Sequence, residues 1–189
     1  MRWYLACWLP ISAVVAAAGC GSGKEATPSP PCDQKCVDGV ALRSLRESLK
    51  LAYNLTLQGN DAGAQEGETP CPDGGSVRVV GEATSNSIQG ATVVDLTFTF
   101  SACAYKRTSS DPEKSYDVVV EGVVREKGTL AVQPTATTAL LLSSDALEIR
   151  GQVYDPPIVY EPGVCALVAS QNGNEVTGTL CGRPARFSF

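Results

Sequence analysis

The sequence predicts a mainly β protein, an antiparallel meander of about eight strands preceded by one helix. One segment has apolar residues at helical spacing, and in the remainder of the chain short runs alternate apolar and polar residues. Gly, Pro, Asn and Ser separate these runs, as is typical of turns. Each strand then has one apolar face, so the sheet must close into a barrel or pack as a sandwich, and the sequence leaves both open.

The predicted helix covers residues 36–59, with Gly59 as its stop. Its apolar positions follow one another at spacings of three, four and three, and so share one face: Leu42, Leu45, Leu49 and Ala52. Four charged residues lie off that face: Arg43, Arg46, Glu47 and Lys50. We expect the apolar face to pack on the protein's own sheet, with a protein partner or a membrane surface as the alternative. Residues 60–70 are polar and rich in Gly, which predicts a loop.

The clearest strand runs from Val94 to Phe100, where even positions are apolar and odd positions polar. The same alternation occurs at Tyr116, Val118, Val120 and Val124, and again at Leu147, Ile149 and Val153. Shorter candidates complete the series: Val77 with Val79, residues 140–142, 164–168 and 176–180, and Phe187 with Phe189.

Residues 1–19 have the organisation of a secretory signal, with Arg2 at the start, an uncharged apolar run and small residues at the end. The run is short for a transmembrane helix and contains Pro10, so a membrane span is the less favoured alternative.

The end of this run, Ala17-Ala18-Gly19-Cys20, resembles the lipobox of bacterial prolipoproteins. The resemblance implies cleavage before Cys20 and attachment of two or three fatty chains, such as palmitate, to that cysteine. Such chains anchor a protein firmly in a membrane. Residues 21–31 are rich in Gly, Ser and Pro and predict a tether. We therefore expect a signal over 1–19, an acylated Cys20 and tether over 20–31, and one domain over 32–189.

Localisation follows from the same resemblance. It implies a lipid-anchored protein of the cell envelope, on the outer membrane where the cell has two, with its domain in the periplasm or on the cell surface.

Apart from Cys7 in the signal and Cys20, six cysteines remain: Cys32, Cys36, Cys71, Cys103, Cys165 and Cys181. An even number in an exported chain without histidine predicts three disulfides. A zinc site would need a reduced cluster, and its best candidate is the spacing of Cys32 and Cys36, so no metal is predicted.

The turn signal Asn172-Gly173-Asn174 predicts a hairpin. A three-residue loop would place Cys165 opposite Cys181 and predicts their disulfide. The same register would put Val164 and Val168 on one face with Leu180.

Cys71 and Cys103 flank a turn near Ser87 symmetrically. Direct pairing would set Val79 against Asp95, and a one-residue offset would bury the apolar face better. Their predicted bridge therefore requires a bulge, placed at Gly74 and Gly75. Cys32 and Cys36 are then left to pair with each other, although pairing of either one into the sheet remains the alternative.

The sequence Cys71-Pro72-Asp73-Gly74-Gly75, with Cys181-Gly182 closing the last hairpin, resembles uncharacterised lipoproteins of myxobacteria over residues 71–182. That resemblance implies no activity.

Composition and motifs argue against several functions. The chain has no histidine, no G-x-S-x-G elbow and no glycine-rich phosphate or dinucleotide loop, so we predict neither catalysis nor a cofactor. Asp117 and Glu121 are the candidates for a glycosidase pair, although solvated strand charges explain them equally well. Loss of Arg2 with the signal would take the net charge from −5 to −6. An acidic protein is a poor partner for nucleic acid, and its membrane contact must come from the acyl chains.

The predicted role is therefore non-enzymatic, either structural or through contact with an envelope protein. The alternative is binding of a small apolar ligand inside a lipocalin-like barrel, with Tyr154 and Tyr160 of a proline-rich loop at its mouth. The two differ in one expectation, because a ligand binder needs a cavity and a structural module needs a filled core.

Overall fold

The computed structural model describes residues 32–86, 90–131 and 137–189. The predicted signal, Cys20 and the tether lie outside these residues, as does Ser87. The chain divides into two compact units, and the second, Pro31–Phe189, holds every described element. The core and all three disulfides lie within this unit, so it contains the interactions that fold it.

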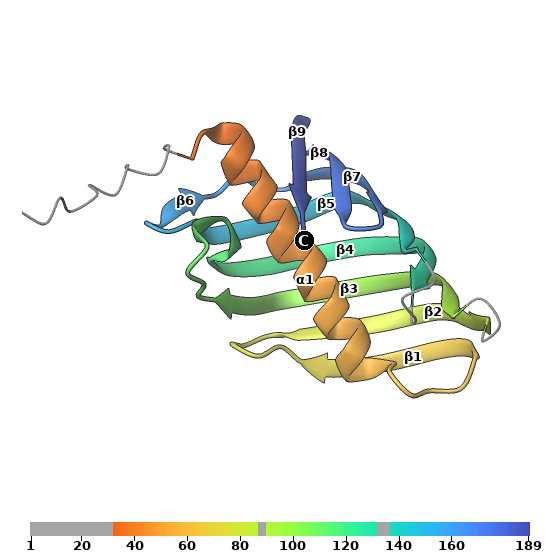
Figure 1. Ribbon diagram of the computed structural model, residues 1–189. Coiled ribbons are helices and arrows are strands. Elements are labelled where there is room, and N and C mark those ends of the chain that lie inside the picture. The colour runs from red at the N-terminus through yellow and green to blue at the C-terminus, as the bar shows by residue number, and fades with distance from the viewer. Residues whose placement is uncertain (1–31, 87–89, 132–136) are drawn as a thin grey trace, which may run out of the picture. The chain divides into compact units, whose positions relative to one another are not determined.

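The described residues form one α-helix and nine strands (Figure 1). In chain order these are α1 (Gln34–Thr56), β1 (Gly63–Pro70), β2 (Ser76–Asn86), β3 (Ala91–Arg107), β4 (Tyr116–Ala131), β5 (Ala139–Val153), β6 (Ile158–Tyr160), β7 (Cys165–Asn172), β8 (Glu175–Leu180) and β9 (Arg183–Ser188). A short 3-10 turn, Pro112–Lys114, joins β3 to β4. None of the described helices is long and apolar enough to cross a membrane.

All strands belong to one antiparallel sheet in the order β1-β2-β3-β4-β5-β7-β8-β9, with β6 paired to β5 beside this path. The predicted meander is confirmed. The predicted loop over residues 60–70 is wrong, because Gly63–Pro70 pairs along its length with β2 as an edge strand. Only Gln65 is buried in this strand, so its sequence lacks the apolar alternation that identifies the others.

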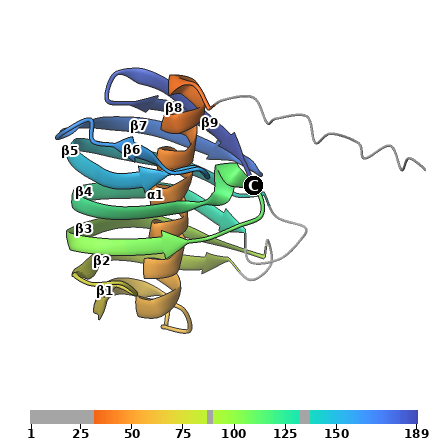
Figure 2. The same ribbon diagram turned by 90° about the vertical axis from the view of Figure 1, so that its left-hand side faces the viewer.

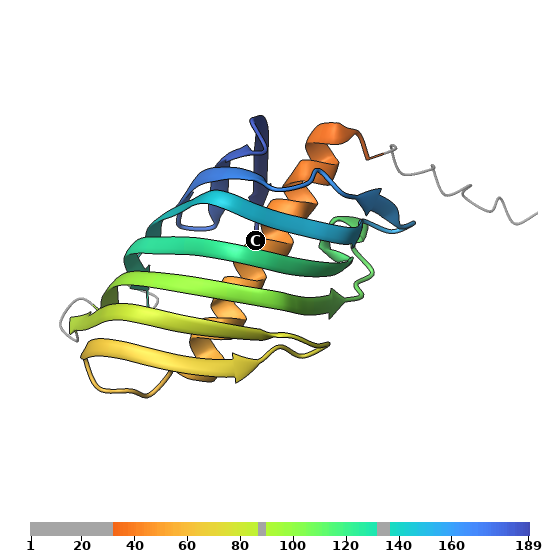
Figure 3. The same cartoon turned by 180° about the vertical axis from the view of Figure 1, so that it is seen from behind.

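The sheet is not closed into a barrel. Instead α1 lies across its inner face, and β9 runs beside the helix at one end of the sheet (Figures 1 and 2). Figure 3 shows the opposite, outer face, which the helix does not cover. The predicted inward residues of β3 are buried, from Val94 to Phe100 at even positions, as is the predicted apolar face of the helix. A single helix thus supplies the apolar cover that a second sheet would supply in a sandwich.

The helix begins at Gln34, two residues before the predicted start, because the Asp33 side chain caps it by accepting a hydrogen bond from the Cys36 backbone at 2.9 Å. It ends at Thr56, and Gly59 lies in the following turn. Arg43 and Arg46, off the apolar line, are nevertheless buried. The curled sheet therefore covers more of the helix than its apolar stripe.

The three predicted disulfides are confirmed: Cys32–Cys36, Cys71–Cys103 and Cys165–Cys181. Their Cα atoms are 5.2, 5.5 and 4.9 Å apart. Neither Cys32 nor Cys36 pairs into the sheet.

The register predicted for the last hairpin is wrong by one residue. Asn172 pairs with Glu175, so Leu167 lies opposite Leu180, where the predicted register would have placed Ala166. Because side chains alternate across a strand, this shift turns the whole strand over. Leu167 is buried, whereas Val164 is 68% exposed.

The register around Cys71–Cys103 also differs from direct pairing. Val79 lies opposite Phe98, three residues away from Asp95 instead of the expected one, and β3 has an irregularity in its pairing with β4 between Phe100 and Cys103. Gly74 accepts a hydrogen bond from the Ala104 backbone here at 2.8 Å, and a Cβ on Gly75 would overlap the carbonyl oxygen of Ala102. The predicted position of the bulge is wrong: Gly74 and Gly75 lie in the turn before β2, and the irregularity lies on β3, in its pairing with β4.

Candidate binding cavity

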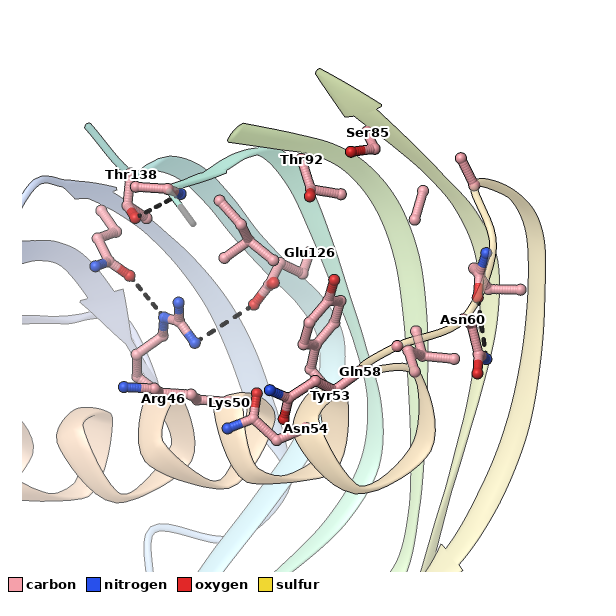
Figure 4. Close-up of a pocket in the computed structure, with 18 of the residues that line it drawn as sticks. Arg46, Lys50, Tyr53, Asn54, Gln58, Asn60, Ser85, Thr92, Glu126 and Thr138 are labelled. Atoms are coloured by element: carbon pink, nitrogen blue, oxygen red, sulfur yellow. Dashed lines mark hydrogen bonds and ion pairs between the residues drawn. The ribbon is translucent and has the colours of Figure 1, made fainter. Parts of the chain in front are cut away.

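A cavity of about 560 Å³ lies between the C-terminal half of α1 and the inner face of the sheet (Figure 4). The residues that line it include Tyr53 and Leu57 near the end of the helix region, Ser85 of β2, Thr92 of β3, and Glu126 with Leu130 of β4. Several lining residues are exposed, so the cavity opens to solvent.

The cavity arises where inward-facing residues become small. Along β2 the inward positions change from Val79 to Ala83 and then Ser85, and along β3 they change from Phe98 to Thr92. The large side chains fill the space beneath the middle of the sheet, and the smaller ones leave it unfilled towards this end.

A buried ion pair forms the most polar part of the wall. The side chains of Arg46 and Glu126 are only 5% and 2% exposed, and Nη1 of Arg46 lies 3.8 Å from Oε2 of Glu126. Arg46 also donates through Nε to Oε1 of Gln171 at 2.6 Å. Oε2 of Glu126 accepts no hydrogen bond from the residues that the structure describes. A buried acceptor of this kind is costly unless something donates to it.

Burial shifts the acid–base equilibria of these groups. Desolvation raises the pKa of Glu126, and the nearby Arg46 charge opposes this rise. Desolvation lowers the pKa of Arg46, opposed by the Glu126 charge. The pKa of Tyr53 is raised by burial first and by the Glu126 charge second. All three shifts indicate a poorly hydrated site in which each charge depends on its partner.

The two tyrosines predicted to edge a ligand site lie elsewhere. Tyr160 is buried in the core, and its hydroxyl donates to Oδ1 of Asp38 at 3.1 Å. Tyr154 lines a smaller hollow of about 220 Å³ together with Arg107 and Gln152. Neither residue lines the larger cavity.

The carboxylates considered for glycoside cleavage lie on the outer face of β4. Asp117 pairs with Lys106 at 2.7 Å, and Glu121 lies 3.9 Å from Arg150. Both are exposed and neither lines the cavity. In the described part of the chain, no group of three or more His, Cys, Asp or Glu residues is placed to hold a metal ion.

The charged residues of the cavity are not predicted from the sequence patterns above, although one signal is present. Glu126 continues the inward phase of Tyr116, Val118, Val120 and Val124, so its position predicts a buried carboxylate. Arg46 is adjacent to the apolar line of α1, and only the curl of the sheet buries it.

These features define a class of architecture: one open antiparallel sheet with a helix across its inner face and a solvent-open cavity beside the end of that helix. Comparison of the chain with protein-family models, with curated proteins and with solved structures finds no match. Its function must be argued from its own geometry.

Proposed function

We propose that this chain is an exported, membrane-anchored, non-enzymatic protein that binds a small, partly apolar ligand in the cavity beside the end of α1. One observation carries the proposal: a cavity of about 560 Å³ whose wall holds a buried carboxylate oxygen, Oε2 of Glu126, to which no residue described by the structure donates a hydrogen bond. Small-molecule sites are concave, mainly apolar and equipped with a few placed polar groups, with volumes of about 300 to 1,000 Å³.

The export and anchoring in this proposal rest on the lipobox-like end of the signal and on the tether that follows Cys20. The three disulfides support export, because such bonds persist in oxidising compartments. The tether would hold the cavity-bearing domain away from the bilayer.

The packing of the core helps to choose between the two predicted roles, a structural or protein-contact module and a binder of a small ligand. It is filled beneath the middle of the sheet, as a structural module requires, yet a cavity remains at one end. On the outer face the exposed apolar side chains Val93 and Val123 are accompanied by ion pairs such as Arg125 with Asp95. Apolar side chains interspersed with charges are common on protein surfaces, so this face does not by itself indicate a protein partner. The ligand site proposed here lies between helix and sheet instead of inside a barrel.

The proposal is tested by mass spectrometry of the chain from Gly21 onward, exported to a periplasm without its anchor. Its mass is measured first under native and then under denaturing conditions. We expect the native mass to exceed the denatured mass by a discrete few hundred daltons. The denatured chain should lack six hydrogens, because three disulfides have formed.

Two neighbouring residues of β3 provide a matched control. Thr92 lines the cavity, whereas Val93 is exposed on the outer face. Thr92→Trp should fill the cavity and abolish the extra mass, and Val93→Trp should retain it. Extra mass that persists in the Thr92→Trp protein would place the ligand elsewhere.

A further inference from the structure

We infer that the ligand of this cavity is a neutral, amphipathic molecule whose polar head presents a hydrogen-bond acceptor and a donor side by side, as a carboxamide does. This inference rests on the proposed ligand-binding function and names the chemical class of its ligand.

The first step is the gap between Arg46 and Glu126. Their closest atoms, Nη1 and Oε2, are 3.8 Å apart, which is longer than a hydrogen bond. The pair therefore offers an N–H donor and, next to it on the cavity wall, a carboxylate oxygen that accepts no hydrogen bond from the described part of the chain (Figure 4). A carboxamide matches both, because its carbonyl oxygen accepts from Arg46 while its N–H donates to Glu126.

The second step is charge. Arg46 and Glu126 neutralise each other, so the buried site has no net charge to offer a ligand. A carboxylate drawn to Arg46 would lie beside the Glu126 carboxylate, and an ammonium drawn to Glu126 would lie beside the Arg46 guanidinium. Either would leave a third charge in a site where burial already disfavours the charged forms of both residues. A neutral head avoids this cost.

The third step is the remainder of the wall. Leu57 and Ala83 are buried beside the cavity, and Leu130 is half-buried there. These side chains can cover the apolar body of a ligand whose head lies at the ion pair. Lys50 and Asp61 also line the cavity, but both are exposed, so solvent weakens their influence on the choice of ligand.

The test uses three probes with the same eight-carbon chain: octanamide, octanoate and octylammonium. Their binding to the chain from Gly21 onward, with its disulfides formed, is measured by titration calorimetry at neutral pH. We expect octanamide to bind at least about tenfold more tightly than either charged probe.

Variants of the pair should reverse this order. Glu126→Gln leaves the Arg46 charge unbalanced, so octanoate should become the tightest probe by about tenfold. Arg46→Gln leaves Glu126 unbalanced, so octylammonium should become the tightest. The control is Arg125→Gln, at the neighbouring and outward-facing position of β4, which should keep the wild-type order. Circular dichroism and the mass of the oxidised chain show whether each variant is folded. If a variant is not folded, the inference is judged from the order of the three probe affinities in the wild-type protein.

Each contrary outcome has a distinct meaning. A wild-type protein that binds octanoate or octylammonium at least as tightly as octanamide contradicts the inferred ligand class but keeps the cavity as a binding site. An unchanged order in both folded Gln variants moves the head group away from this pair and overturns the inference. A bound molecule that none of the probes displaces also overturns the ligand class. No binding by any probe, together with equal native and denatured masses, overturns the proposed function itself.

Discussion

The guanidinium of Arg183 donates two hydrogen bonds to the carboxylate of Asp38, from Nε to Oδ2 at 2.8 Å and from Nη2 to Oδ1 at 2.7 Å. Asp38 lies near the start of α1, and Arg183 begins β9 at the far end of the sheet order. Asp38 is 1% exposed and also accepts from the hydroxyl of Tyr160. This contact ties the helix to the end of the sheet that curls beside it.

We predict that Arg183→Gln lowers the free energy of unfolding by about 1.5 to 3 kcal/mol, the range for hydrogen bonds to charged groups. The lower part of that range is favoured because the Arg183 side chain is 40% exposed. Urea unfolding measures the loss. Arg186→Gln, on the same strand but exposed, is the control and should change stability by less than about 0.5 kcal/mol. Equal losses in the two variants would show that the Asp38 contact has no special role.

A second prediction concerns a close approach of α1 to β9 at Gly39. A Cβ on Gly39 would lie 2.6 Å from the backbone oxygen of Arg186, which is too close for any side chain. Alanine normally favours a helix over glycine by about 1 kcal/mol. Here we expect Gly39→Ala to destabilise the protein by about 1 to 3 kcal/mol, because the helix and strand must move apart. Thermal unfolding checks this, with Asn54→Ala at an exposed helical position as the control that should not destabilise. A stabilised Gly39→Ala protein would mean that the two elements are not in contact.

A third prediction treats Arg46 and Glu126 as a unit. Removing one partner leaves the other charge buried without compensation, so Arg46→Met and Glu126→Leu should each cost about 3 to 5 kcal/mol. The double variant should be more stable than either single variant, because it leaves no buried charge. A double-mutant cycle from urea unfolding measures this coupling, and simple additivity of the two losses would argue against the pair.

A fourth prediction concerns pH. Hydrogen bonds from Arg125 first and Lys127 second lower the pKa of Asp95 from 3.8 to about 2. Its folded pKa is lower than its unfolded value, so its contribution to stability is present above about pH 4 and is lost as the pH falls towards 2. Carbon-detected NMR titration of the Asp95 carboxyl should show this low value, and Arg125→Gln should raise it. Lys127→Gln should raise it less. A pKa near 3.8 in the folded wild-type protein would contradict the pairing on the outer face.

Most of the secondary structure followed from local patterns, with β1 as an exception. Alternation from Val94 to Phe100 predicts a half-buried strand because a β-strand repeats every two residues, and the spacing of Leu42, Leu45 and Leu49 predicts a helix face. Three disulfides were also expected from the even number of cysteines, and hairpin turns predicted Cys71–Cys103 and Cys165–Cys181, while the pairing of Cys32 with Cys36 stayed open. Helix and strand periodicity depends on neighbours in the chain.

The register of the strands and the closure of the sheet did not follow from local sequence patterns. A shift of one residue between β7 and β8 turned Val168 outward and Leu167 inward, while the cysteines stayed close enough to bridge. Turn signals locate a hairpin but do not distinguish a two-residue loop from a three-residue one when Asn and Gly occupy every position. The strand β1 went unrecognised because an edge strand requires hydrogen bonds from its neighbour more than apolar side chains.

The sequence by itself thus determined the helix, most of the strands, the expectation of three disulfides, and which catalytic motifs are missing. Only the tertiary structure decided that the helix covers the sheet, that β9 lies beside it, and that Arg46 meets Glu126 at a cavity. The physical reason is that these contacts join residues distant in the chain. The charges of Arg46 and Glu126 are buried only because the sheet curls around the helix, and that curl depends on all the strands together.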